Sequence, residues 1–244
     1  MFEFIINWII SMREWLLLAF MSFLPPLIYT IWIRNTEKYH REKWRTILVC
    51  FLWGASIAII AALILEILLE IPLAASIEKY DTLTLMTVVF VAPVAEEFTK
   101  PLALRLKSVK REINELEDGL IYGAVAGLGF SATENLFYGW SFLTEGIFIF
   151  LILISIRSFA GCLLHASATA LTGYGYGKVI MKHTSILRII PYFILAIFIH
   201  AFYNFLVTIE LIGAITGLFA ALIFVAFSIT IVRRKIKSLD SKYG

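Results

Sequence analysis

Two adjacent glutamates, Glu96 and Glu97, lie in a stretch that is otherwise apolar enough to cross a membrane. Even the mildest insertion scale sets the cost of one carboxylate in a bilayer at about 2.5–3.5 kcal/mol. Lys100 follows three and four residues later, so on a helix its ammonium can reach either carboxylate. The two glutamates point about 100° apart on an ideal helix, so one can face a cavity while the other pairs with Lys100 or an adjoining helix. We interpret the pair as part of a buried polar site.

Further polar side chains occur in the apolar segments that follow. They are Glu134, Asn135, Arg157, His165, His200 and Asn204. Arg157 and His165 share one helical face, and so do His200 and Asn204, because the members of each pair are separated by a multiple of four residues. Arg157 is expected to supply the counter-charge for a carboxylate on a neighbouring helix.

Glutamate and histidine are the side chains that a hydrolytic site in a low-dielectric pocket requires. A buried carboxylate can take a proton from water, and histidine or asparagine can donate to the oxyanion that forms as a carbonyl is attacked. The same set could instead hold Zn²⁺ through His165, His200 and a carboxylate such as Glu134, with one position open for water. At this point both kinds of site remain open.

The elements that must position these residues are membrane helices. Of the 244 residues, 60% are hydrophobic and only 16% are charged, which predicts an all-α, polytopic transmembrane bundle. A span needs about 20 mostly apolar residues, and seven segments qualify: 15–33, 46–68, 82–105, 119–140, 146–172, 189–208 and 211–232. We expect one membrane-embedded domain over residues 1–244, with an interfacial helix at 1–14 rather than a cleavable signal.

Prolines indicate that the carboxylate pair lies on an irregular helix. Pro93 removes a backbone donor one turn before Glu96, and Pro101 disfavours regular helix directly after Lys100.

A stripe of small residues in the fourth predicted span indicates a close helix contact. Glycine recurs every four residues, at Gly119, Gly123 and Gly127. Small side chains at this spacing let two helices approach each other closely in lipid. The stripe is therefore predicted to carry Glu134 and Asn135 into the protein interior.

The distribution of positive charge predicts the orientation in the membrane. Basic residues concentrate in segments 34–45, 105–111, 178–188 and 233–242, whereas the alternate connections contain only Lys79. The positive-inside rule then places the N-terminus outside and the C-terminus in the cytoplasm. The connections are too short to build a basic face for nucleic acid, so the net charge of +3 is attributed to topology.

Four motifs occur in order on four successive predicted spans. They are Glu96-Glu97-x-x-Lys100, Phe130-x-x-x-Glu134-Asn135, the lone His165, and His200-x-x-x-Asn204. Together, over residues 87–205, they resemble the PrsW family of intramembrane proteases, which are relatives of the CAAX prenyl endopeptidases and Abi proteins. The prenyl endopeptidases carry histidine in place of Glu134 and typically arginine near Lys100, so this chain resembles the PrsW branch more closely.

The resemblance implies an endopeptidase of the cell membrane that cuts a membrane-anchored protein. The PrsW type is known for the first cut in an anti-sigma factor, so the expected partner is an anti-sigma-factor-like or other single-span protein within the lipid bilayer. The residue roles that the resemblance implies are water activation by Glu97 or Glu96, assistance or metal binding by His165, and oxyanion stabilisation by His200 with Asn204. Glu134 would be a metal ligand or a second acid/base.

Two other classes of function are weighed against the protease. A noncatalytic scaffold, like the nonenzymatic scaffold subunit of gamma-secretase, could use the histidines for assembly but would not require the carboxylate pair. A proton-coupled transporter could use buried Glu, His, Arg and Lys as a relay. The sequence lacks the repeated halves with matching broken helices that many transporters show.

The estimated depths of the motif residues in the membrane do not agree with a single shared site. Counted from the predicted outer ends at ~1.5 Å per residue, Glu134 lies ~9 Å deep and His165 ~30 Å deep. Either the helices tilt or kink, or one motif residue lies outside the catalytic site, and the estimated depths of these two residues differ most. The remaining titratable residues are assigned to the interface (Glu66, Glu70) or to solvated loops (His40, His183).

Overall fold

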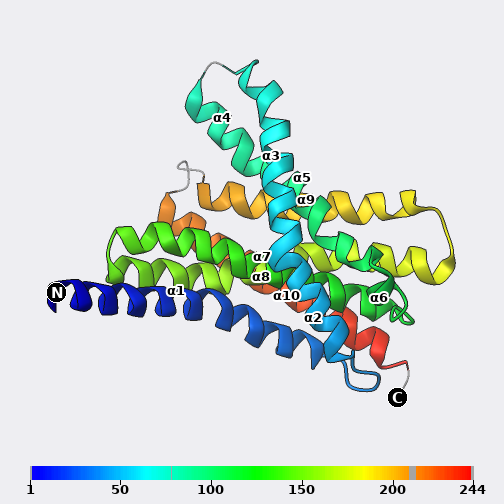
Figure 1. Ribbon diagram of the computed structural model, residues 1–244. Coiled ribbons are helices and arrows are strands. Elements are labelled where there is room, and N and C mark those ends of the chain that lie inside the picture. Colours follow the sequence, from blue (N-terminus) through cyan, green and yellow to red (C-terminus); the bar gives the residue numbers. More distant parts are fainter. Residues whose placement is uncertain (1, 78, 209–212, 243–244) are drawn as a thin grey trace.

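The computed structural model describes residues 2–77, 79–208 and 213–242, and within these ranges every regular element is a helix. The α-helices in chain order are α1 (Phe2–Arg34), α2 (Trp44–Trp53), α3 (Ile59–Ala74), α4 (Tyr80–Met86), α5 (Ala92–Thr99), α6 (Lys107–Lys110), α7 (Leu116–Thr144), α8 (Ile147–Lys182), α9 (Ile190–Thr208) and α10 (Ala214–Asp240) (Figure 1). The predicted all-α fold is confirmed.

Helices α7 and α8 form the centre of the molecule, and the predicted glycine stripe explains their close contact. A Cβ atom on Gly123 would lie 2.5 Å from the carbonyl oxygen of Thr169, and one on Gly127 would lie 2.3 Å from that of His165. Because real Cβ atoms do not approach this closely, only glycine permits this separation of the two backbones. The stripe therefore brings the polar part of α7 directly against α8.

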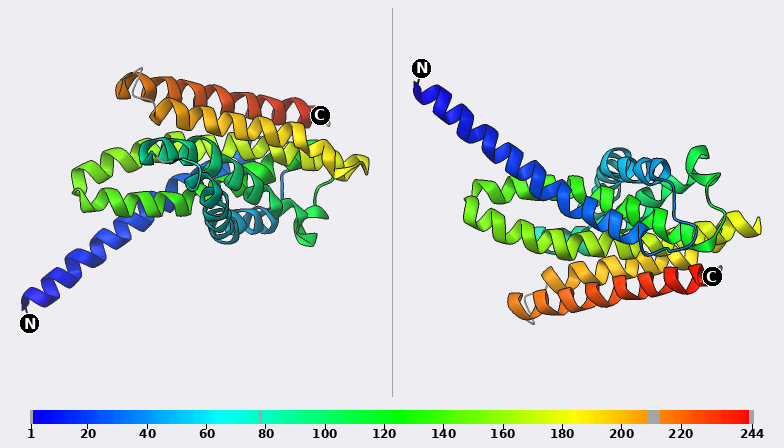
Figure 2. Two further views of the ribbon diagram at one scale, coloured as in Figure 1. Left: turned by 90° about the horizontal axis from the view of Figure 1, so that it is seen from above. Right: turned by 90° about the horizontal axis from the view of Figure 1, so that it is seen from below.

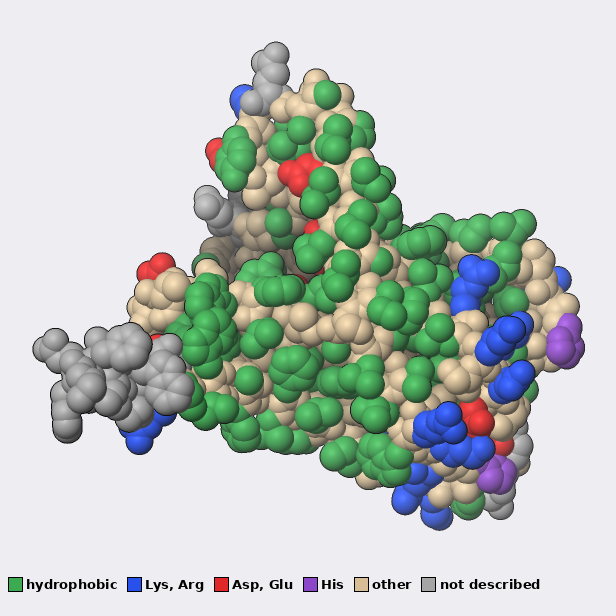
Figure 3. All heavy atoms as spheres, viewed as in Figure 1, with side chains coloured by type: hydrophobic (Ala, Val, Ile, Leu, Met, Phe, Trp, Pro, Cys, Tyr) green, Lys and Arg blue, Asp and Glu red, His purple; other side chains and the backbone are tan. Residues whose placement is uncertain are grey.

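The other helices surround this pair. Seen from above, α9 and α10 lie along one side of α7 and α8, and α2 and α3 lie along the other (Figure 2). The hairpin of α3 and α4 projects from the bundle (Figure 1), while α3 also contacts α5. On the face shown in Figure 3, lysine and arginine side chains gather at one end of the molecule, whereas the middle is covered by hydrophobic side chains.

Six helical stretches are long and apolar enough to cross a membrane: Met12–Arg34, Trp44–Ala74, Tyr80–Arg105, Ile147–Lys182, Ile186–Thr208 and Ala214–Asp240. They correspond to six of the seven predicted spans. The seventh, 119–140, is part of α7, which is less apolar because it carries several glycines and the acidic Glu117, Asp118 and Glu134. Neighbouring helices bury most of α7, so it does not need an apolar surface. The number of spans and their orientation stay predictions.

The helix that carries the glutamate pair is irregular on both sides, as Pro93 and Pro101 predict. A π-helical segment, Thr87–Val91, precedes α5, and a 3₁₀ segment, Lys100–Arg105, follows it. Both prolines remove a backbone donor from the regular helical pattern. Short π segments are frequently found at functional sites.

Candidate active site

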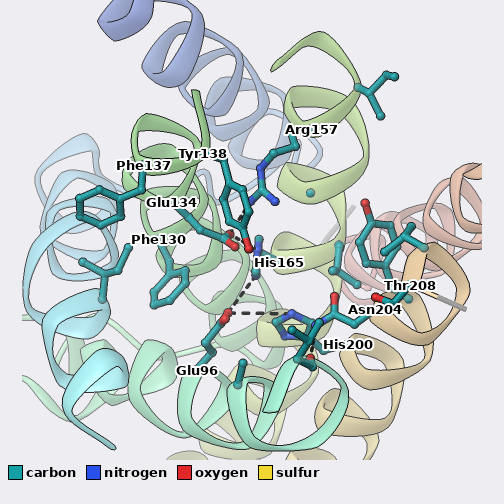
Figure 4. Close-up of a pocket in the computed structure, with 18 of the residues that line it drawn as sticks. Glu96, Phe130, Glu134, Phe137, Tyr138, Arg157, His165, His200, Asn204 and Thr208 are labelled. Carbon is teal, nitrogen blue, oxygen red and sulfur yellow. Dashed lines mark hydrogen bonds and ion pairs between the residues drawn. The ribbon is translucent and has the colours of Figure 1, made fainter. Parts of the chain in front are cut away.

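A cavity of about 680 Å³ is lined by residues of the helices α3, α5, α7, α8 and α9. This volume is within the usual range for ligand-binding sites. Side chains from all four motifs and the predicted counter-charge Arg157 line it, as Figure 4 shows: Glu96, Glu134, Arg157, His165, His200 and Asn204. The tertiary structure thus brings together residues that are more than 100 positions apart in the sequence.

Lys100 is the central cation of this site and is completely buried. Its Nζ atom lies 2.6 Å from Oε2 of Glu96 and 3.0 Å from Oε1 of Glu97. It also donates to Nδ1 of His165 over 2.8 Å, and it lies 4.3 Å from the centre of the Phe130 ring. The predicted contact with either glutamate is therefore a contact with both, and it extends to α8.

The two glutamates have different surroundings. Glu97 has no exposed surface, and its oxygens accept from Lys100, from Nδ1 of His200 at 3.0 Å and from the Thr169 hydroxyl at 2.9 Å. Glu96 lines the cavity instead and keeps a small exposed fraction of 7%. Of the two carboxylates, Glu96 is the one that a molecule in the cavity can contact.

Glu134 and His165 meet directly, although their estimated depths differ. Nε2 of His165 lies 2.7 Å from Oε2 of Glu134, and Nη2 of Arg157 lies 2.9 Å from the same oxygen. The estimate failed because it assumed that every helix starts at the same level and runs straight along the membrane normal. Arg157 is the predicted counter-charge, and its Nε atom also donates to Oδ1 of Asn135 at 3.1 Å.

The hydrogen bonds of the two histidines determine which ring nitrogen of each carries the proton. An ammonium can only donate, so Nδ1 of His165 accepts from Lys100 and its Nε2–H donates to Glu134. A carboxylate accepts, so Nδ1–H of His200 donates to Glu97 and Nε2 keeps its lone pair. Oε2 of Glu96 lies 3.6 Å from Nδ1 of His165 and 3.9 Å from Nε2 of His200.

This donor set fits a metal ion. The ligand atoms of Glu96, His165 and His200 all lie within 4.8 Å of one another and belong to buried residues. The other ring N–H of each histidine donates a hydrogen bond to a carboxylate, as metal-bound histidines commonly do. The carboxylate close to both histidines is Glu96, and not Glu134, which was expected as a possible ligand. Glu134 instead accepts a hydrogen bond from Nε2–H of His165, the ring nitrogen that does not face Glu96.

Asn204 anchors the irregular helix. A π-helical carbonyl pairs with the N–H five residues later, and for Val88 that position is Pro93, which has no N–H. The side-chain Nδ2 of Asn204 donates to the Val88 carbonyl over 2.8 Å. The amide that was expected to stabilise an oxyanion therefore already holds α9 against the segment that precedes Glu96.

Sequence reasoning gave too little weight to two residues. Glu66 was assigned to the membrane interface, yet it lines the cavity together with Glu96 and Glu134. An acidic residue inside an apolar span was the available signal, as it was for the glutamate pair. Thr169, which contacts Glu97, lies four residues after His165 on the same helical face, and this spacing was the signal for it.

Comparison with known proteins finds a protease that is similar to about half of the chain. Over 125 residues the chain is 33% identical to Protease PrsW of Clostridioides difficile (strain 630), an alignment that covers 51% of each protein. The chain thus matches about half the length of this curated relative. No solved structure matches the chain.

A sequence profile of the PrsW family of intramembrane metalloproteases matches residues 42–231, which include all four motifs. The match spans most of the chain and extends well beyond the residues of the cavity. The chain is an integral, multi-pass membrane protein and belongs to the PrsW family of intramembrane metalloproteases.

Proposed function

We propose that the protein is an endopeptidase of the cell membrane that hydrolyses a peptide bond of a membrane-anchored protein, such as an anti-sigma-factor-like or other single-span protein. The observation that supports this most strongly is the convergence of Glu96, His165 and His200 at one cavity. Family membership and the partial match to Protease PrsW support the same activity. A noncatalytic scaffold would not need an accessible carboxylate between two oriented histidines.

In the proposed reaction, Glu96 is the base because it is the glutamate that faces the cavity. It takes a proton from water as the water oxygen adds to the scissile carbonyl carbon. When the carbon–nitrogen bond breaks, the protonated Glu96 gives that proton to the leaving amine. Lys100 is 2.6 Å from Glu96 and holds its carboxylate in place.

The remaining residues position these groups and balance their charge. Glu97 holds His200, and Glu134 holds His165. The three carboxylates face two permanent cations, Lys100 and Arg157, so one negative charge is left over among these five side chains. A cation bound between Glu96 and the histidines would therefore enter a site of net negative charge.

We propose Zn²⁺ as that cation, because a Glu-His-His set with an open position is typical of catalytic zinc. Glu96, His165 and His200 would hold it. In that case Glu96 would act as a ligand, and the role of base described above applies to the metal-free site. When bound, Zn²⁺ would supply a Lewis acid that polarises the scissile carbonyl and makes water more acidic. Lys100 competes for the same lone pair of His165, since it donates to Nδ1. Metal content of purified, active protein, measured together with sensitivity to a chelator, tests this assignment.

The activity is tested by co-expressing the chain with a panel of doubly tagged single-span membrane proteins from the same cell and following their cleavage. Glu96→Gln and His200→Ala should abolish the cleavage of any substrate that the wild type cuts, while both variants remain inserted in the membrane. Glu70→Gln is the matched control, because Glu70 is an acidic residue within the apolar helix α3 that does not line the cavity.

Two results would overturn the proposal. One is retained cleavage by the purified Glu96→Gln/Glu97→Gln/His200→Ala variant. The other is a protein that cuts nothing, while the same substitutions prevent its assembly with a partner, which would favour the scaffold.

A further inference from the structure

A second group of buried carboxyl side chains lies far from the cavity. It is built from the connection between α1 and α2, the start of α7 and the end of α10, which meet at the basic end of the molecule (Figures 1 and 3). Asp118 in this group is 16 residues before Glu134 on α7, or ~24 Å along the helix. We call the group the acidic cluster; its members are Glu37, Glu42, Glu115, Glu117, Asp118 and Asp240.

The acidic cluster has almost no positive partner. All six side chains are buried, with exposed fractions between 0% and 7%. Buried carboxylates are normally paired with cations or bound to metals. Within the described part of the chain, the one basic side chain in a salt bridge with the cluster is His40, whose Nδ1 lies 2.7 Å from Glu115. The nearby Lys43 pairs with Glu112 instead.

Backbone groups orient several of these carboxylates. Asp240 accepts from the backbone N–H groups of Lys38 and Tyr39, at 2.9 and 3.1 Å. Asp118 accepts from the backbone N–H of Glu115 at 2.8 Å, and Glu37 accepts from that of Glu42 at 3.1 Å. The carboxylates are therefore held in fixed directions by segments that are up to 202 residues apart.

Among the residues that the structure describes, three buried oxygens of the cluster have no hydrogen-bond partner. They are Oε1 of Glu37, Oε2 of Glu115 and Oε1 of Glu117. Glu37 is completely buried, and it belongs to two sets of three residues whose ligand oxygens lie within 4.8 Å of one another. One set adds Glu115 and Asp118, and the other adds Glu117 and Asp240. Ionised carboxylates only accept, so they cannot satisfy one another.

The chemistry of this donor set identifies the class of ligand that would satisfy it. Every donor is a carboxylate oxygen, and such sets suit hard cations such as Ca²⁺ and Mg²⁺ rather than Zn²⁺. A cavity of about 290 Å³, lined by Glu42 and Glu115 among others, lies directly beside the cluster and provides space for access and for coordinating water.

We propose that the acidic cluster is a binding site for a hard divalent cation, Ca²⁺ or Mg²⁺, with Glu37 as the central ligand. Glu115 and Asp118 form one set of candidate ligands with Glu37, and Glu117 and Asp240 form the other. The cation joins the α1–α2 connection to α7 and α10 and so stabilises this end of the helical bundle. The proposal is independent of the proteolytic activity.

Protons are the competing means of neutralising the cluster. Burial and the neighbouring carboxylates Asp118 and Asp240 raise the pKa of Glu37 to about 8, and burial with Asp118 raises that of Glu42 to about 9. If protons neutralise the cluster, the stability of the protein should not change when divalent cations are added. If the cluster binds a cation, the stability should increase.

The test uses the full-length protein, purified in detergent and stripped of metals with a chelator. Ca²⁺, Mg²⁺ and Zn²⁺ are added back in separate samples, and thermal unfolding is followed. Ca²⁺ or Mg²⁺ at about 100 times its Kd should raise the Tm by roughly 5–10 °C, and the comparison of these two samples identifies the preferred ion. Glu37→Gln should lose this increase.

Glu112→Gln is the matched control, because Glu112 is an acidic residue of the neighbouring loop that pairs with Lys43 outside the cluster. It should keep the full increase in Tm. His200→Ala separates this site from the cavity, because it should keep the response to Ca²⁺ or Mg²⁺ while losing Zn²⁺.

Equilibrium dialysis of the wild type with radioactive Ca²⁺, and with Mg²⁺ measured by elemental analysis, decides the matter even where Glu37→Gln fails to fold. About one bound ion per chain supports the site. Absence of binding of both ions, or an equal Tm increase in Glu37→Gln and the wild type, overturns it.

Discussion

The candidate active site and the acidic cluster both bury several carboxylates, but they balance the negative charge in different ways. In the cavity, Lys100 and Arg157 pair with Glu96, Glu97 and Glu134, and two histidines complete the set. In the acidic cluster, the described residues supply no lysine or arginine partner. The first site is thus nearly neutral without any ligand, whereas the second needs protons or a cation from solution.

The kinds of donor differ as well. Nitrogen and oxygen atoms surround the position between Glu96, His165 and His200, and oxygen atoms alone surround Glu37. A mixed set favours Zn²⁺ and a carboxylate set favours Ca²⁺ or Mg²⁺. The two proposals therefore assign different metals to the two sites, one for chemistry and one for stability.

The largest expected effect concerns the base in the cavity. Glu96→Gln should lower the rate of proteolysis by about 10²–10⁴-fold, the usual contribution of a general base, with little change in Tm because the amide oxygen can still accept from Lys100. Cleavage of a purified substrate in proteoliposomes measures this. A larger loss in Glu70→Gln than in Glu96→Gln would contradict the assignment.

Removal of the cation that balances the cavity should mainly affect stability. Lys100→Met leaves Glu96 and Glu97 without their shared partner, and breaking a buried ion pair costs about 3–5 kcal/mol in the free energy of unfolding. The variant also frees Nδ1 of His165, so Zn²⁺ should restore part of the lost stability. Denaturant unfolding with and without Zn²⁺ tests both statements, and the exposed Lys107→Met serves as the control.

A residue that acts through a histidine should have an intermediate effect. Glu134→Gln removes the carboxylate behind His165, and such changes lower metal affinity or activity by about 10–100-fold. Because a positioning role predicts weaker metal binding, Zn²⁺ affinity is measured beside the rate. Unchanged affinity together with an unchanged rate would show that Glu134 only pairs with Arg157.

The smallest effect is expected in the acidic cluster without divalent cations. The pKa of Glu42 is raised to about 9, so its carboxyl is protonated at pH 7 in the ion-free protein. Glu42→Gln replaces one neutral group with another and should change stability by about 1 kcal/mol or less. Denaturant unfolding at pH 7 without divalent cations measures this change. A loss of stability as large as that of Lys100→Met would show that the two regions do not differ in how they neutralise their carboxylates.

Local patterns in the sequence predicted much of the fold. Hydropathy identified the apolar helices, prolines at 93 and 101 predicted an irregular helix around Glu96, and the glycine stripe ending at Gly127 predicted the contact of α7 with α8. These features depend on residues that are close in sequence. The missing N–H of proline and the missing Cβ of glycine affect the backbone at the position of the residue itself. Residue type and spacing also selected six side chains that prove to line one cavity.

Contacts between distant residues depended on the tertiary structure. Spacing on one helix could not show which of Glu96 and Glu97 faces the cavity, and helix length could not place Glu134 beside His165, because tilt and register decide both. The side chain of Asn204 donates to a carbonyl that is 116 residues away in the sequence. The acidic cluster was not predicted, because its members resemble ordinary loop carboxylates until folding buries Glu37 and Asp240 together.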